Sequence, residues 1–242
     1  HSLPLDPTPQ TLTRYIAYSS LYISSSSKYL SGARYFLMHI FPDFDTNRSH
    51  PLVQAAIKGS MKIRGSNINR KLPLRLHHLS AFLTIARRSK DYDDLLFICL
   101  LSACFFACHR SGEVVVSDDK RLLDWRKVIK RSSFVSSNNH VTYRLPYHKA
   151  DRFYHGSDIL FIRFQAVDAC PVLLLQEYIS LRDSIHGARP ALFIRKDGSL
   201  PARRWFISKL HCVVNHDYGG HSARAGGATF YASLGLSEDI IQ

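Results

Sequence analysis

Acidic residues are scarce in this sequence. Among its 242 residues, 19 are Asp or Glu and 32 are Lys or Arg, which gives a formal net charge of +13 with neutral histidines. Such an excess attracts polyanions, of which nucleic acid is the commonest. A membrane surface is the rival partner, but no amphipathic helix with a Lys/Arg-lined polar face stands out. We therefore expect a nucleic-acid partner and no membrane.

Cysteine pairs are lacking as well. The sequence holds five cysteines, an odd number, and no Cys-x-x-Cys pair. This pattern indicates neither a zinc site nor a disulfide framework. It favours a reducing, intracellular compartment, which would be the nucleus in a eukaryotic host.

Long apolar runs are also missing. The longest covers residues 95–108 and is broken only by Ser102, whereas a bilayer-spanning helix needs about 20 residues. The run predicts a buried central helix, with Cys99, Cys104 and Cys108 as small core side chains. There is no nucleophile elbow, glycine-rich phosphate loop or metal-ligand cluster, so a hydrolase that does not act on DNA is a remote alternative.

The chain reads as two domains joined by a linker. Residues 1–64 predict three or four helices, with Pro51 opening one of them. Residues 65–75 are basic and broken by Gly and Pro, as a linker would be. Two interpretations of its charges stay open, a solvated loop or phosphate contacts. The candidate DNA-binding residues are Lys62, Arg64, Arg70, Lys71, Arg75 and, further along, Arg152.

The second domain, residues 76–242, is expected to be mainly helical with one small antiparallel sheet. Two helices come first, the second being the apolar run. Strands are predicted over 127–135, 141–145 and 158–163, with turn residues at 136–140. Helices then resume at Pro171, near Ala202 and at Ser222.

Three separated signals carry candidate chemistry. Arg110 follows the apolar run, and Glu113 lies at the helical spacing for a salt bridge with it. Lys149 lies between two predicted strands. His221 and Arg224 fall on one face near a helix N-terminus, where an anion is favoured. Gly226 and Gly227 in the same helix predict a close backbone approach.

In this order the segments Arg110-Ser-Gly-Glu113, Lys149 and His221-Ser-Ala-Arg224-Ala-Gly-Gly resemble the tyrosine recombinase, or phage integrase-like, family, in particular recombinases of fungal mobile elements. The resemblance implies a helical, SAM-like core-binding domain over 1–64 and an α+β catalytic domain over 76–242. It implies site-specific breaking and rejoining of double-stranded DNA through a 3′-phosphotyrosyl intermediate. It also implies a dimer or tetramer on DNA when the protein is full length.

The resemblance further implies a role for each site residue. Arg110 and Arg224 would bind the scissile phosphate, and Lys149 would be the general acid. His221 would assist proton transfer from the nucleophile, and Glu113 would orient its neighbours. No cofactor or metal is implied, because the arginines supply the positive charge.

The sequence departs from the family at its end. The nucleophilic tyrosine and a second His/Trp position are expected beyond Gln242, so we expect a C-terminally truncated fragment that binds DNA without cleaving it. Tyr231 follows His221 too closely to reach the phosphate and is expected to pack. Two alternatives stay open: an inactive DNA-binding protein derived from a recombinase, and a type IB topoisomerase.

Overall fold

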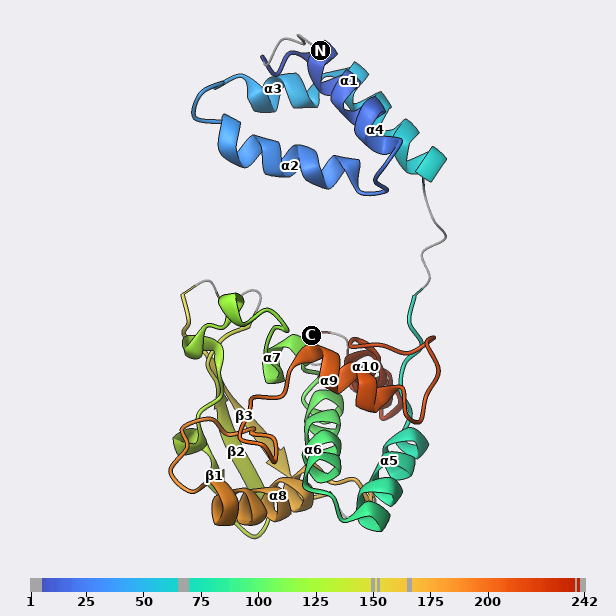
Figure 1. Cartoon of the computed structure of the whole chain (residues 1–242). Helices are drawn as coiled ribbons and strands as arrows, with labels where there is room; N and C mark the ends of the chain where they lie inside the picture. Colours follow the sequence, from blue (N-terminus) through green and yellow to red (C-terminus); the bar gives the residue numbers. More distant parts are fainter. Residues whose placement is uncertain are drawn as a thin grey trace. The chain divides into compact units, whose positions relative to one another are not determined.

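The computed structural model describes residues 6–64, 70–148, 151, 153–164, 167–237 and 239, with the side chain of Arg64 left out. The chain forms two compact units, His1–Arg70 and Lys71–Gln242 (Figure 1). No helix in the described ranges is long and apolar enough to cross a membrane.

The first unit is a small bundle of helices. These are α1 (Pro9–Ser20), α2 (Ser26–Leu37), α3 (Phe44–Ser49) and α4 (Pro51–Arg64). Pro51 is the first residue of α4, as predicted, because its fixed φ suits a first helical position. A compact core holds the bundle together, formed by Leu12, Ile16, Leu30, Phe44 and Val53.

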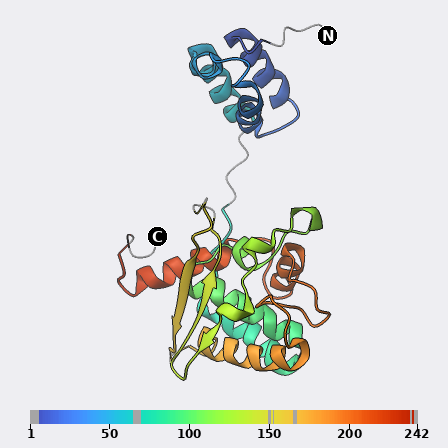
Figure 2. The same ribbon diagram turned by 90° about the vertical axis from the view of Figure 1, so that its left-hand side faces the viewer.

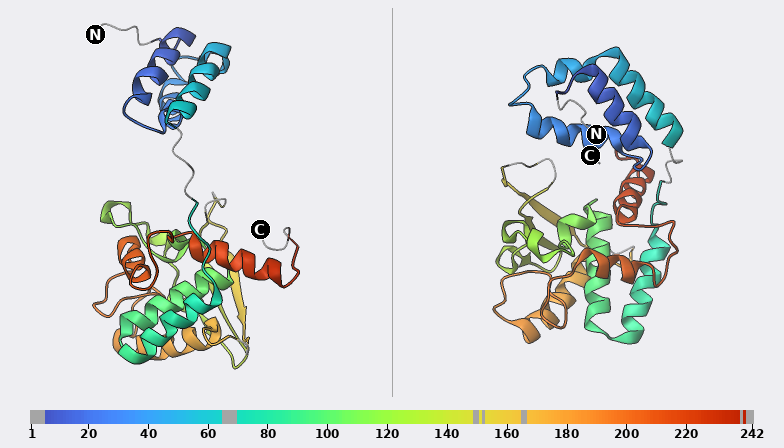
Figure 3. Two further views of the ribbon diagram at one scale, coloured as in Figure 1. Left: turned by 90° about the vertical axis from the view of Figure 1, so that its right-hand side faces the viewer. Right: turned by 45° about the horizontal axis from the view of Figure 1, so that its top comes forward.

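A buried helix organises the second unit. Its helices are α5 (Leu76–Ser89), α6 (Tyr92–Phe106), α7 (Ser111–Val114), α8 (Pro171–His186), α9 (Arg203–Leu210) and α10 (Ser222–Ser233). The middle helix α6 packs against α5, α8 and α10, and Figure 3 shows these elements around it. Asp91 caps α6 by accepting hydrogen bonds from the backbone N–H groups of Asp93 and Asp94 at 2.9 and 3.1 Å.

The predicted central helix is confirmed, but it ends sooner than expected. We expected it to continue to Cys108, and α6 stops at Phe106. Cys108 adopts a left-handed conformation with φ of 51°, which an α-helix cannot continue through. The chain therefore turns, and residues 109–113 leave the axis of α6.

A three-stranded antiparallel sheet lies in the same unit, in the order β1-β2-β3 (Figure 2). Its strands are β1 (Val135–Ser136), β2 (His140–Leu145) and β3 (Ser157–Ile162). Val141 pairs with Phe161, and Val141, Tyr143 and Leu145 of β2 are buried. This alternation is typical of a strand that covers a core with one face.

The strand predicted over 127–135 is wrong for most of its length. Short 3-10 helices occupy Trp125–Lys127 and Arg131–Ser133 instead. The backbone between them pairs elsewhere: Leu192 N–H donates to Ile129 O, and Arg131 N–H donates to Pro190 O, both at 2.8 Å. Residues after α8 thus take the hydrogen bonds that a hairpin with β2 would have used.

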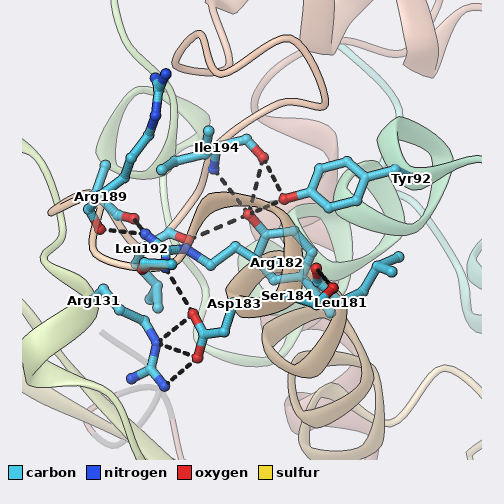
Figure 4. Close-up of polar contacts among 12 residues, drawn as sticks. Tyr92, Arg131, Leu181, Arg182, Asp183, Ser184, Arg189, Leu192 and Ile194 are labelled. Carbon is cyan, nitrogen blue, oxygen red and sulfur yellow. Dashed lines mark hydrogen bonds and ion pairs between the residues drawn. The ribbon is translucent and has the colours of Figure 1, made fainter.

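The turn after α8 is built around a buried arginine. The side chain of Arg182 is fully buried, and it donates to the carbonyls of Gly187, Arg189 and Ala191. Its guanidinium also contacts Asp183, which is held by Arg131 from the other side (Figure 4). This network fixes the loop that replaces the predicted strand pairing.

Part of the segment expected as a linker, residues 71–75, belongs to the second unit. The chain divides after Arg70, and the following residues lie on the second unit. Leu72 and Leu74 donate backbone hydrogen bonds to Asp217 and Ser222, and Leu74 is fully buried. Burial of this apolar side chain fixes the end of the segment to the core of the second unit.

Candidate anion-binding site

The candidate site begins at the turn between α6 and α7. The left-handed Cys108 directs the chain so that Arg110 becomes the residue just before α7. The side chain of Arg110 is 38% exposed, whereas that of Glu113 is 9% exposed. The cation therefore faces solvent while the anion that holds it is covered.

Glu113 holds Arg110 by two hydrogen bonds. The backbone N–H of Arg110 donates to Oε2 of Glu113 at 2.9 Å, and the Nη1 of its guanidinium donates to Oε1 at 3.1 Å. The salt bridge predicted from their spacing is confirmed. The backbone bond fixes the carboxylate of Glu113, and the second bond restricts the guanidinium while leaving its other N–H groups available to an anion.

The electrostatics of this pair favour the charged state. Burial alone would raise the pKa of Glu113, but His109 and the backbone and guanidinium N–H groups of Arg110 together lower it from 4.5 to about 2. Glu113 is therefore ionised throughout the physiological pH range. It remains a fixed negative charge behind Arg110.

Arg224 reaches the same turn from α10. Its Nη1 donates to the backbone carbonyl of Cys108 at 3.0 Å, two residues before Arg110. The structure thus brings the Arg224 guanidinium to the segment that carries Arg110, although the two lie far apart in the sequence. A partly buried guanidinium with one N–H engaged keeps further donors for a ligand.

Glycines allow α10 to come this close. A Cβ on Gly227 would overlap the carbonyl oxygen of Phe105, and one on Gly226 would overlap that of Leu74. A Cβ on Gly220 would lie 2.6 Å from Ser111 Oγ. The close backbone approach predicted for Gly226 and Gly227 is confirmed, and it places the first turn of α10 against the end of α6.

His221 is the residue that immediately precedes α10. Its carbonyl accepts the N–H of Ala225, and its imidazole is exposed. Arg224 lies in the first turn of the same helix. The structure thus keeps His221 near the N-terminus of α10, as the sequence predicted. Within the described part of the chain, no hydrogen bond or ion pair engages its imidazole.

Lys149 and Arg152 lie outside the described residues. Between them lies Asp151, which accepts the N–H groups of Phe153 at 3.2 Å and Gly156 at 2.8 Å. The rings of Tyr147 and Tyr154 lie 5.1 Å apart. Neither tyrosine is free: Lys127 lies over the Tyr147 ring, and Tyr154 donates to Asp124.

The other predicted DNA-binding residues are spread over both units. Lys62 is exposed on α4, and Arg70 is exposed at the end of the first unit. Lys71 donates from Nζ to the carbonyl of His216 at 2.5 Å. Arg75 is exposed, and its backbone N–H donates to Nδ1 of His78 at 3.0 Å. The side chain of Arg64 lies outside the described part.

His109 and Tyr231 also lie near the site. His109 was missed: it is buried and contacts Glu113 and Tyr143, and its spacing of four residues from Glu113 was the available signal. Tyr231, expected to pack, donates to the carbonyl of Phe106 at 2.7 Å. Burial raises the pKa of its phenol, which makes the phenolate harder to form.

Comparison with solved structures identifies the fold. The chain resembles the XerH site-specific recombinase in its post-cleavage complex with palindromic difH substrate, with a TM-score of 0.50 and 15% identity over 72% of this chain and 45% of that chain. A pre-cleavage XerH complex with difH substrate gives a TM-score of 0.49 and 17% identity, over 79% and 56% of the two chains. The chain has a tyrosine recombinase-like fold. It spans about half the length of these recombinases, and neither a family model nor a curated protein sequence matches it.

Proposed function

We propose that the chain binds double-stranded DNA and supplies the phosphate-binding part of a tyrosine-type DNA breaking and rejoining site. One observation carries the proposal. Arg224 binds the carbonyl of Cys108, two residues from Arg110, and Glu113 anchors Arg110 behind it. Two guanidinium groups at one turn suit a phosphodiester, which accepts forked hydrogen bonds from both.

The chemistry follows from where negative charge develops. Attack on a phosphodiester produces a five-coordinate transition state with extra charge on its non-bridging oxygens. Arg110 and Arg224 stabilise that charge with donors fixed in advance, which saves reorganisation during the reaction. Lys149 protonates the leaving oxygen as general acid, and His221 assists proton transfer from the nucleophile. We assign no nucleophile within this chain.

The first unit serves as a helical core-binding domain in this proposal, and the second as the catalytic domain. Lys62, Arg64, Arg70, Lys71, Arg75 and Arg152 contact the DNA backbone. The net charge of +13 supplies the sequence-independent attraction to DNA. The similar XerH proteins are solved with DNA substrates, which supports this partner.

Gel shifts with a DNA duplex at two salt concentrations test the proposal. A protein that contacts 6–10 phosphates loses about 10³–10⁵-fold in affinity between 50 and 200 mM salt, and we expect a loss of that kind. Arg110→Ala and Arg224→Ala should each weaken binding about tenfold, the cost of a charge-assisted hydrogen bond.

Arg121→Ala is the matched control. Arg121 is exposed and paired with Asp119, so removing it tests the loss of one surface cation away from the turn. We expect a change of less than about threefold. Equal affinity at both salt concentrations, or equal effects of the three arginine variants, would contradict the proposed function.

A further inference from the structure

A buried histidine lies between the sheet and the Arg110 turn. His109 is 3% exposed. Its Nε2 lies 2.8 Å from the hydroxyl of Tyr143 on β2, and its Nδ1 lies 3.5 Å from Oε2 of Glu113. A buried imidazole with a polar partner on each ring nitrogen is held in one orientation.

The carboxylate of Glu113 and the hydroxyl of Tyr143 together set the tautomer of His109. Tyr143 is 1% exposed, and burial raises the pKa of its phenol, so the hydroxyl keeps its proton at neutral pH. The carboxylate of Glu113 beside Nδ1 can only accept, so Nδ1 of a neutral His109 carries the ring proton, and Nε2 accepts the hydroxyl proton of Tyr143.

The N–H at Nδ1 faces a carboxylate that is already bonded to Arg110. One oxygen of Glu113 accepts the backbone N–H of Arg110, and the other accepts its guanidinium. At 3.5 Å the His109 contact is longer than an ordinary hydrogen bond, so it acts through the field of the N–H dipole. This dipole comes from the interior and opposes rotation of the carboxylate away from Arg110.

We infer that His109 is a positioning residue for Arg110, with Tyr143 holding its Nε2 and Glu113 transmitting its effect. The inference rests on the proposed function, in which Arg110 holds a phosphate. It also ties β2 to the arginine turn. β2 ends at Leu145, a few residues before Lys149, the proposed general acid. The contact of Tyr143 with His109 therefore links the strand that precedes Lys149 to Arg110.

Two substitutions distinguish the role of Nδ1 from the role of Nε2 in His109. The amide nitrogen of Asn can take the place of Nδ1, so His109→Asn keeps a donor toward Glu113. The amide of Gln extends to the place of Nε2, so His109→Gln keeps the Tyr143 contact and loses that donor. We expect His109→Gln to weaken binding to a DNA duplex about fivefold and His109→Asn less than about twofold.

A double-mutant cycle shows whether the effect passes through Arg110. In the Arg110→Ala background, His109→Gln should cause no further loss, because the residue that it positions is already absent. Tyr143→Phe removes only the hydroxyl and should reproduce part of the His109→Gln loss in the native background. The same loss from His109→Gln in both backgrounds would overturn the inference.

A measurement made without DNA tests the positioning role of His109 independently of the proposed DNA binding. The Nε–H signal of Arg110 in NMR spectra, assigned by its loss in Arg110→Ala, reports how rigidly the guanidinium is held. We expect a sharp, slowly exchanging signal in the native protein and in His109→Asn, and a broadened one in His109→Gln. Failure of the native protein to bind DNA would refute the proposed function, whereas an unchanged Arg110 signal in folded His109→Gln and Tyr143→Phe would overturn the positioning role.

Discussion

Replacing Glu113 with glutamine should destabilise the second unit in a pH-dependent way. The pKa of Glu113 falls from 4.5 to about 2 on folding, and each pKa unit corresponds to about 1.4 kcal/mol. The ionised carboxylate thus contributes about 3 kcal/mol to the free energy of unfolding at neutral pH. Because folding lowers the pKa, the contribution is complete above pH 4.5 and is lost as the pH falls toward 2. Glu113→Gln should therefore cost about 3 kcal/mol at pH 7 and almost nothing near pH 2.

Urea unfolding followed by tryptophan fluorescence can isolate this effect. Trp125 and Trp205 are the two tryptophans of the sequence, and both belong to the second unit. Unfolding curves at pH 7, 5, 4 and 3 would give the difference between native protein and variant at each pH. Glu177→Gln is the matched control, because it breaks an exposed ion pair with Arg87 and should cost less than about 1 kcal/mol. A loss below 1 kcal/mol for Glu113→Gln at pH 7, or a loss that stays constant from pH 7 to 3, would refute the assigned electrostatics.

Three further predictions concern the crossing of α10 and α6, the buried Arg182 and the reactivity of Tyr231. Gly227→Ala should cost about 3 kcal/mol in urea unfolding, because its methyl group would overlap the carbonyl of Phe105; Gly112→Ala, whose Cβ meets no atom within 4 Å, should cost less than 1 kcal/mol, and equal costs would contradict the close approach. Arg182→Met should cost about 3–5 kcal/mol in the same assay, since it leaves three carbonyls without their donor and removes one of the two arginines that hold Asp183. A cost below 1 kcal/mol would show that water replaces the arginine. A suicide DNA substrate should trap no covalent adduct with this chain, because the hydroxyl of Tyr231 is bonded to Phe106 and its pKa is raised; an adduct that Tyr231→Phe abolishes would make Tyr231 the nucleophile.

Local geometry explains what could be predicted from the sequence. The Arg110–Glu113 pair depends on a spacing of three residues within one turn, and that contact is present. The Gly226–Gly227 pair costs helix stability wherever it occurs, so a close approach was the physical reason to expect it there. Both inferences needed only the residues within one helix and its immediate flanks.

Contacts between distant segments explain what could not be predicted. The alternating residues at 127–135 fit a strand, but their backbone partners lie after α8, at Pro190 and Leu192. The turn at Cys108 uses a left-handed conformation that nothing in its side chain favours. The partner of His109 is a tyrosine on β2, and no local pattern indicates that pairing.

The packing of α6 and the geometry of the candidate site depend on one another. Phe105 is both a buried core residue of α6 and the residue whose carbonyl meets Gly227 of α10. Three residues further on, Cys108 gives its carbonyl to Arg224, and the chain then reaches Arg110. A displacement of α10 by one methyl group would therefore move Arg224 relative to Arg110, since close-packed interiors transmit such changes and absorb few of them. Substitutions at this helix crossing should reduce DNA affinity although none of these residues contacts DNA. Across such variants, the loss of affinity should correlate with the displacement of Arg224 better than with the loss of free energy of unfolding.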